Sequence, residues 1–246
     1  IFCYAHRGTL SVAAPFMIHD LRLSASVMGV LLSAFFWTYS LLQVPAGWLV
    51  DRYGVRRAYA LGYTLWSLAS AATGLAGNLA GLIAARTCVG VGQSVAFPAS
   101  ARAVANWFRD RERGTVTGLY LTGVRLGQAL VSYAGAFIIA AYGWKGFFLA
   151  TGLPPLLWLL PWLGFLKTWE AGPASLPLRS GSEAPKGPSF LRSLGLLGNR
   201  TVFGIFLGFF AYDYAWFVFV TWLPGYLVME RKFSTREMGI YSSVPY

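Results

Sequence analysis

The 246-residue chain is poor in charge and in cysteine, and both shortages restrict what it can be. Only 12% of its residues are charged, whereas soluble domains carry about 25%, so a water-soluble globular domain is excluded. The two cysteines, Cys3 and Cys88, lie in apolar runs without the spacing of a disulfide framework or a metal site. A phosphate-binding G-x-x-x-x-G-K-[ST] loop is also missing, which disfavours an ATP-driven pump. We therefore expect neither a metal nor another cofactor.

Apolar residues make up 56% of the chain and gather in long runs. A helix needs roughly 20 mostly apolar residues to cross a bilayer, and several runs reach that length. They predict an all-α, multi-pass integral membrane protein. The predicted spans cover residues 1–18, 24–50, 58–75, 79–104, 115–141, 146–166 and 200–228, with an eighth starting near residue 236.

The stretch 167–199 differs from the spans because it is polar and rich in the helix breakers proline and glycine. It divides the chain into three predicted parts. These are a six-helix transmembrane bundle at 1–166, a linker at 167–199, and the start of a second bundle at 200–246, which holds the seventh helix and part of the eighth. Both ends of the chain lie inside apolar runs, so we expect both to be cut.

Basic residues outnumber acidic ones by 20 to 9, which gives a formal net charge of +11. On a soluble chain this surplus would suggest nucleic acid, but here the basic residues sit at the ends of apolar runs. Loops after the second, fourth and sixth spans hold eleven Lys and Arg residues, against five in the other loops. Because Lys and Arg are retained on the cytoplasmic side, we expect the linker to lie in the cytoplasm and the protein to lie in the plasma membrane. We expect the lipid bilayer as its partner and no binding of nucleic acid.

Four charged side chains fall near the middle of predicted spans: Arg7, Arg86, Arg125 and Asp213. At 1.5 Å per residue, each lies about 12 to 18 Å from a span end. An arginine at that depth costs about 2.5 to 3.5 kcal/mol if it faces lipid, so these side chains are expected to face an interior. Three arginines and one aspartate give this interior a net charge of +2. The planar guanidinium group of arginine binds a carboxylate or a phosphate well. The alternative is that the arginines bond to backbone carbonyls or pair with Asp213 to hold the bundle together.

The loop between the second and third spans has the pattern G-x-x-x-D-R-x-G-x-R-R. Glycine allows close packing and tight turning, and the acid can pair with a basic group or a helix N-terminus on a neighbouring span. Such a contact can latch one side of the protein shut and release it, although a tight loop can also carry these residues for topology alone. The pattern resembles the signature loop of the major facilitator superfamily of transporters. Its residues are Gly47, Asp51, Arg52, Gly54, Arg56 and Arg57.

Further motifs resemble the anion:cation symporter branch of that superfamily, which includes bacterial sugar-acid transporters and animal organic-anion transporters. The resemblance implies the major facilitator fold of twelve helices, of which this chain would hold the first bundle and the start of the second. It also implies secondary active transport of a small organic anion by alternating access, with proton symport. The motifs are Tyr4–Ser11, Ser33–Trp37, Phe97–Pro98, Trp107–Phe108, Arg111–Gly114 and Thr221–Leu227.

The resemblance also assigns roles to individual residues. Arg86 falls on the arginine of the fourth span that is implicated in anion binding. Arg7 follows a position where sugar-acid symporters commonly carry an acid, but this chain has His6 there. Gln93 stands where those symporters carry a glutamate implicated in proton coupling. We expect Arg7, Arg86, Arg125, Tyr4 and Gln93 to form the substrate site.

Proton coupling needs another carrier if both familiar acids are missing. Of the nine acidic residues, only Asp213 lies deep within a span, and the imidazole of His6 changes charge near neutral pH. We therefore expect Asp213 to carry the coupling proton, with His6 as the second candidate. The alternatives are a permanent ion pair for Asp213 and a packing role for His6.

Three other functions stay open at this point. The chain could belong to an anion uniporter or exchanger, or to a transporter-like receptor without proton coupling. A membrane-embedded transferase would need a cluster of His, Asp, Glu and Ser side chains at a membrane face, and no such cluster is evident in the sequence.

Overall fold

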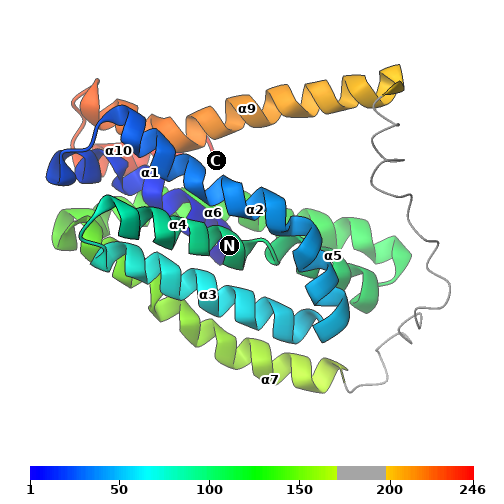
Figure 1. Cartoon of the computed structure of the whole chain (residues 1–246). Helices are drawn as coiled ribbons and strands as arrows, with labels where there is room; N and C mark the ends of the chain where they lie inside the picture. Colours follow the sequence, from blue (N-terminus) through cyan, green and yellow to red (C-terminus); the bar gives the residue numbers. More distant parts are fainter. Residues whose placement is uncertain (171–197) are drawn as a thin grey trace.

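The computed structural model describes residues 1–170 and 198–246, and these ranges contain helices but no strand (Figure 1). Most of the predicted linker 167–199 lies outside the described residues, and its first four residues continue the last helix of the first bundle. The first bundle contains α1 (Phe2–Leu21), α2 (Ala25–Tyr53), α3 (Val55–Leu75), α4 (Leu79–Gln93), α5 (Ala96–Trp107), α6 (Asp110–Gly152), the short 3-10 helix η1 (Pro154–Trp158) and α7 (Leu159–Glu170). After the linker come α9 (Arg200–Met229) and α10 (Thr235–Ser243).

The described helices follow the predicted spans, but their bounds differ at two places. The fourth span is divided between α4 and α5 by a short turn at 94–95. Helix α6 contains both the fifth span and the start of the sixth, which meet at Gly143, where the backbone turns with φ 68° and ψ 175°. Within residues 1–170 and 198–246, four helical stretches are long and apolar enough to cross a membrane by length and composition alone: Ala25–Tyr53, Leu79–Trp107, Asp110–Gly164 and Arg200–Met229.

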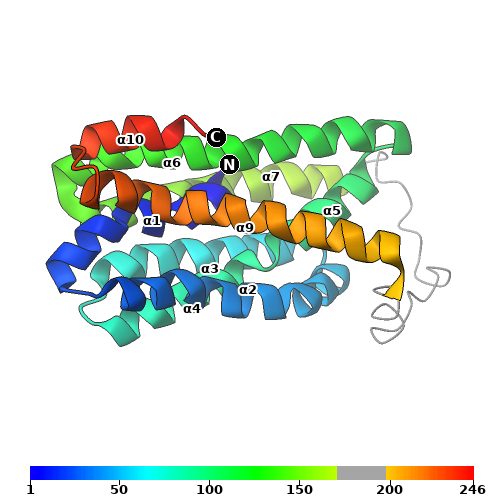
Figure 2. The same cartoon turned by 90° about the horizontal axis from the view of Figure 1, so that it is seen from above.

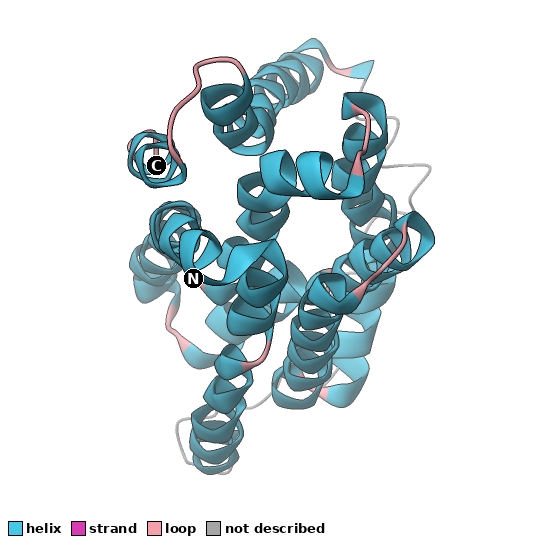
Figure 3. Ribbon diagram, turned by 90° about the vertical axis from the view of Figure 1, so that its left-hand side faces the viewer, coloured by secondary structure: helices cyan, strands magenta, loops and turns pink. Residues whose placement is uncertain are grey.

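Local sequence signals begin and end several of these helices. The Ser24 side chain accepts a hydrogen bond from the backbone of Val27 and caps α2, and the Asn78 side chain does the same for α4 from Gly81. Gly54 is the one residue between α2 and α3, and its φ of 80° is a conformation that side-chain-bearing residues rarely adopt. The described loops between these helices are short (Figure 3).

Helices α3 and α4 pack at backbone contact through two glycines. A Cβ atom on Gly62 would lie 2.7 Å from the Gly92 carbonyl oxygen, and a Cβ on Gly92 would lie 2.7 Å from the Gly62 carbonyl oxygen. Small residues permit this approach where no hydrophobic effect drives helices together. The contact fixes the position of α4, and α4 supplies two residues of the candidate site.

Helix α1 lies inside the bundle and packs against α6 over much of its length. Gly127 of α6 meets its first turn, since a Cβ there would lie 3.1 Å from the backbone nitrogen of Ala5. Deeper in the bundle, Leu10 and Met17 of α1 are buried with Phe147 of α6 in the largest apolar cluster. This burial holds α1 rigidly and places its polar residues inside the protein.

Helices α9 and α10 meet the first bundle mainly at one end of the molecule. Helix α10 packs against α6, and α9 packs against α1 (Figures 1 and 2). The buried residues of α9 are Val220, Pro224 and Leu227, all in its last third. The other end of α9, which begins at Arg200, diverges from the bundle (Figure 1). Helices α9 and α10 therefore contact the preceding helices at the α10 end, whereas the start of α9 lies apart from them.

Candidate functional site

Arg7 of α1 is half-buried, and two of its three guanidinium nitrogens are held by polar neighbours. Its Nε donates a hydrogen bond of 2.9 Å to Oε1 of Gln93, and Nη1 lies 3.5 Å from the hydroxyl of Tyr4. The third nitrogen, Nη2, is buried and has no hydrogen-bond partner among the described residues. Since a buried donor without an acceptor is costly, this nitrogen is available to an acceptor from outside the chain.

Aromatic rings surround the Arg7 guanidinium. Its Cζ lies 4.2 Å from the ring centroid of Tyr39, 4.6 Å from Tyr4, 5.1 Å from Phe35 and 5.9 Å from Phe97. Ring faces attract a cation and are poorly hydrated, and each contact contributes roughly 0.5 to 2 kcal/mol. The rings stabilise the charge without neutralising it, so Arg7 keeps its full attraction for an anion.

Gln93 of α4 fixes the orientation of Arg7. Its Oε1 accepts from Arg7, while its Nε2 donates a hydrogen bond of 3.1 Å to the backbone oxygen of Cys3. Both ends of the amide are therefore engaged with α1, and the side chain is fully buried. Gln93 supplies an acceptor to Arg7 but adds no negative charge.

Arg86 lies on the same face of α4 as Gln93, two helical turns earlier, and is more deeply buried than Arg7. The residue is 3% exposed, and its Nε and Nη1 have no hydrogen-bond partner among the described residues. Its Cζ lies 5.9 Å from the Phe35 ring centroid. Burying a charge without a partner costs free energy. Binding of an anion next to Arg86 would therefore be favourable.

His6 is 1% exposed and precedes Arg7 on α1. Its Nδ1 lies 2.8 Å from the Phe2 carbonyl oxygen, which can only accept, so Nδ1 carries a hydrogen. The other nitrogen, Nε2, is buried and has no hydrogen-bond partner in the described part of the chain. His6 thus lies inside the bundle and contributes no negative charge to the two arginines.

Arg125 of α6 contacts α9 rather than the other two arginines. Its Nη2 donates a short hydrogen bond to the Tyr212 hydroxyl, and its Cζ lies 3.5 Å from the Trp216 ring centroid. Both partners belong to α9, so Arg125 links the first bundle to the start of the second.

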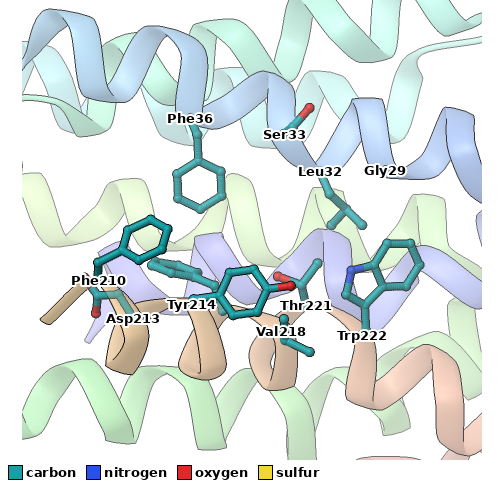
Figure 4. A pocket seen from close by; sticks show the side chains of 11 residues that line it. Gly29, Leu32, Ser33, Phe36, Phe210, Asp213, Tyr214, Val218, Thr221 and Trp222 are labelled. Carbon is teal, nitrogen blue, oxygen red and sulfur yellow. The ribbon is translucent and has the colours of Figure 1, made fainter. Parts of the chain in front are cut away.

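Asp213 lies one residue after the partner of Arg125 and faces a cleft between α2 and α9 (Figure 4). The cleft has a volume of about 420 Å³, and Ser33, Phe36, Tyr214 and Thr221 also line it. Asp213 is half-buried and makes no ion pair with any residue that the structure describes. A permanent pair with Arg7, Arg86 or Arg125 is therefore not formed in this conformation.

The segment 47–57, which was predicted as a loop, is helical except at Gly54 and ties the end of α2 and the start of α3 to other helices. Asp51 lies 3.5 Å from Nε of Arg102 on α5. Arg56 donates from Nη2 to the Leu163 carbonyl oxygen at 2.8 Å, and its own carbonyl oxygen accepts from Nε1 of Trp162 at 3.2 Å. The ion pair is exposed and so contributes only about 0 to 1 kcal/mol. A weak contact of this kind can form and break as helices move.

Comparison with known proteins identifies the family. The model of the Major Facilitator Superfamily matches residues 1–246, the whole chain. The chain belongs to the Major Facilitator Superfamily. Together with its apolar helices, this membership makes it an integral membrane protein, and it confirms the fold class and the resemblance that the sequence predicts.

Two curated members of the superfamily show how much of a transporter the chain contains. It is 33% identical over 266 residues to the probable galactarate/D-glucarate transporter GarP of Escherichia coli (strain K12), a match that covers 98% of the chain and 60% of GarP. It is also 33% identical over 248 residues to the hexuronate transporter of Bacillus subtilis (strain 168), covering 99% of the chain and 57% of that protein. The chain thus spans about three fifths of the length of these relatives, whose names are those of transporters rather than enzymes.

A solved structure supports the fold. The chain superposes with a TM-score of 0.83 on the crystal structure of a bacterial homologue of the human lysosomal transporter Spinster, at 20% identity. The match covers 99% of this chain and 56% of the other. At this identity the likeness concerns the fold alone.

In this superfamily member, the predicted substrate residues fall into two groups. Arg7, Tyr4 and Gln93 are in direct contact, and Arg86 joins them around Phe35. Arg125 stands apart, in contact with α9.

The residue that reasoning from the sequence did not single out is Phe35, whose ring lies beside Arg7 and Arg86. The motif Ser33–Trp37 contains it, but only the packing of α2 shows which of its aromatic residues points inward.

Proposed function

We propose that the full-length protein is a secondary active transporter of a small organic anion, in particular a carboxylate such as a sugar acid. The single observation that carries this proposal is the pair Arg7 and Arg86. Both guanidinium groups lie inside the helix bundle with buried nitrogens that lack an acceptor, and neither forms an ion pair among the described residues. A carboxylate supplies the acceptors and the charge that both groups lack. The relatives named as sugar-acid transporters point to the same substrate class.

The arrangement of the two bundles fits alternating access. They touch at the α10 end and separate toward the linker end. The excess of Lys and Arg on that side favours the cytoplasm. In this proposal the described conformation faces inward, and the segment 47–57 closes the cytoplasmic side in the opposite state.

The test of this function is uptake by the full-length protein. Purified protein is reconstituted into liposomes and supplied with radiolabelled glucarate, gluconate or glucuronate, with and without an inward pH gradient. We expect accumulation of at least one of these sugar acids above that of empty liposomes. A folded, reconstituted protein that neither accumulates nor exchanges any of the three contradicts the proposal and favours a receptor.

Proton coupling is the finer part of the proposal, and we assign it to Asp213. This carboxyl group lines the open cleft between α2 and α9 and is not held by an ion pair with any described residue. His6 is the second candidate, but it is enclosed in the bundle. Gln93, which cannot titrate, bonds to Arg7 directly, and this observation favours the alternative of an uncoupled anion uniporter or exchanger.

Replacing Asp213 by asparagine distinguishes the two alternatives. We expect Asp213→Asn to lose uphill accumulation under a pH gradient and to retain anion exchange at equal pH, because only the proton carrier is removed. His6→Ala serves as the comparison and is expected to keep most of the gradient-driven uptake. If both variants accumulate substrate as the unmodified protein does, neither residue carries the proton.

A further inference from the structure

Arg7 and Arg86 approach the same side chain from different helices. Both Cζ atoms lie within 6 Å of the Phe35 ring centroid, at 5.1 Å and 5.9 Å. Arg7 comes from α1 and Arg86 from α4, so the ring of α2 stands beside two cations at once. The two charges therefore act on one small region of the interior.

No negative charge within the described residues is paired with this region. The groups next to Arg7 are the amide of Gln93, the hydroxyls of Tyr4 and Tyr39, the thiol of Cys3 and aromatic rings, and none of them is a carboxylate. Arg86 has no hydrogen-bond or ion-pair partner in the described part of the chain. Asp213 lines the cleft between α2 and α9 and acts electrostatically on Tyr4, which contacts Arg7, but it forms an ion pair with neither arginine. The site thus holds two guanidinium groups that have no ion-pair partner among the described residues.

We infer that this site selects substrates with two negative charges over otherwise similar substrates with one, and that Gln93 sets this selectivity by holding Arg7 without neutralising it. The inference rests on the proposed anion transport and adds the charge class of the substrate. A monoanion leaves one buried cation unpaired, whereas a dianion compensates both. A six-carbon sugar acid with a carboxylate at each end is such a dianion.

Gln93 acts as a positioning residue in this scheme. A carboxylate at the same place would also accept from Nε of Arg7, but it would cancel one of the two charges. The amide keeps the geometry and leaves the charge, and its second hydrogen bond to Cys3 prevents it from turning away. Because charges in a poorly hydrated interior interact over about 10 Å, we expect the preference for a dianion to be at least about tenfold.

The experiment compares two ligands that differ in one carboxylate. The dissociation constants of glucarate and gluconate are measured by isothermal titration calorimetry on the purified full-length protein at pH 7.5. We expect glucarate to bind at least about tenfold more tightly than gluconate. In Gln93→Glu this ratio should fall by about tenfold or more, and in Gln93→Asn it should stay high. Arg200→Gln, which changes an exposed residue at the start of α9, should leave both constants unchanged.

The outcomes separate this inference from the proposed function. Equal or tighter binding of gluconate overturns the inference and leaves anion transport standing, and so does an unchanged ratio in Gln93→Glu. Failure of both ligands to bind a protein that elutes as a single species on size exclusion overturns the proposed function and the inference together. Arg86→Gln gives a second check, because it should weaken glucarate binding more than gluconate binding, whereas Arg86→Lys should preserve the order.

Discussion

Replacing Arg7 by glutamine in the full-length protein is expected to lower sugar-acid binding and uptake by a factor on the order of 10 to 100. A hydrogen bond to a charged group contributes about 1.5 to 3 kcal/mol, and each 1.4 kcal/mol changes affinity about tenfold. Nη2 of Arg7 is the buried donor that has no acceptor among the described residues, so its removal takes away both the bond and the charge. Binding measured by calorimetry and uptake measured in liposomes should fall together.

Replacing Arg7 by lysine separates the effect of the positive charge from the effect of the planar guanidinium group. Arg7→Lys keeps the positive charge but loses the planar fork that bonds to Gln93 and an anion at the same time. We expect an intermediate affinity for this variant, between those of the unmodified protein and Arg7→Gln. Arg200→Gln should bind normally because Arg200 is exposed and far along α9 from the site. Unimpaired binding in Arg7→Gln would show that the substrate lies elsewhere.

The sequence predicted the helices better than the contacts between them. The length of the apolar runs depends on the bilayer thickness, so the spans and the depth of Arg86 could be predicted from local pattern. The burial of Arg86 agrees with that prediction, as its 3% exposure shows. Which helix an arginine touches depends on packing angles that no local pattern specifies.

Arg125 illustrates the part that could not be predicted. Its depth in the fifth span resembles that of Arg7, and depth alone placed both in the substrate site. The structure gives Arg125 the partners Tyr212 and Trp216 on α9, which are more than 80 residues further along the chain. The contact is made by long side chains that join α6 to α9, and its distance in sequence hides it from any local pattern. Whether Arg125 also binds substrate stays a prediction.

Gly239 of α10 is the residue on which closure of the α10 end depends most directly. A Cβ atom there would collide with the Cβ of Ala136 on α6 and would lie 3.1 Å from the Ser132 carbonyl oxygen. The absence of a side chain therefore lets α10 reach the α6 backbone. This contact is made in the conformation in which α9 diverges from the first bundle at the linker end. In the proposed alternating-access cycle it belongs to one of the two states.

We expect Gly239→Leu to stop transport almost completely and to shift the protein toward the state that is open at the α10 end. The added side chain cannot fit between α10 and α6, and rigid packed interfaces do not absorb a whole side chain by small adjustments. The shift is measured with single cysteines placed at Leu223 of α9 and Ile139 of α6, whose labelling by a membrane-impermeant thiol reagent should increase when α9 and α10 move away from α6. Gly114→Leu is the matched control, because a Cβ on that helical glycine meets nothing within 4 Å. Normal uptake in Gly239→Leu would mean that closure at this end does not need α10 and α6 in backbone contact.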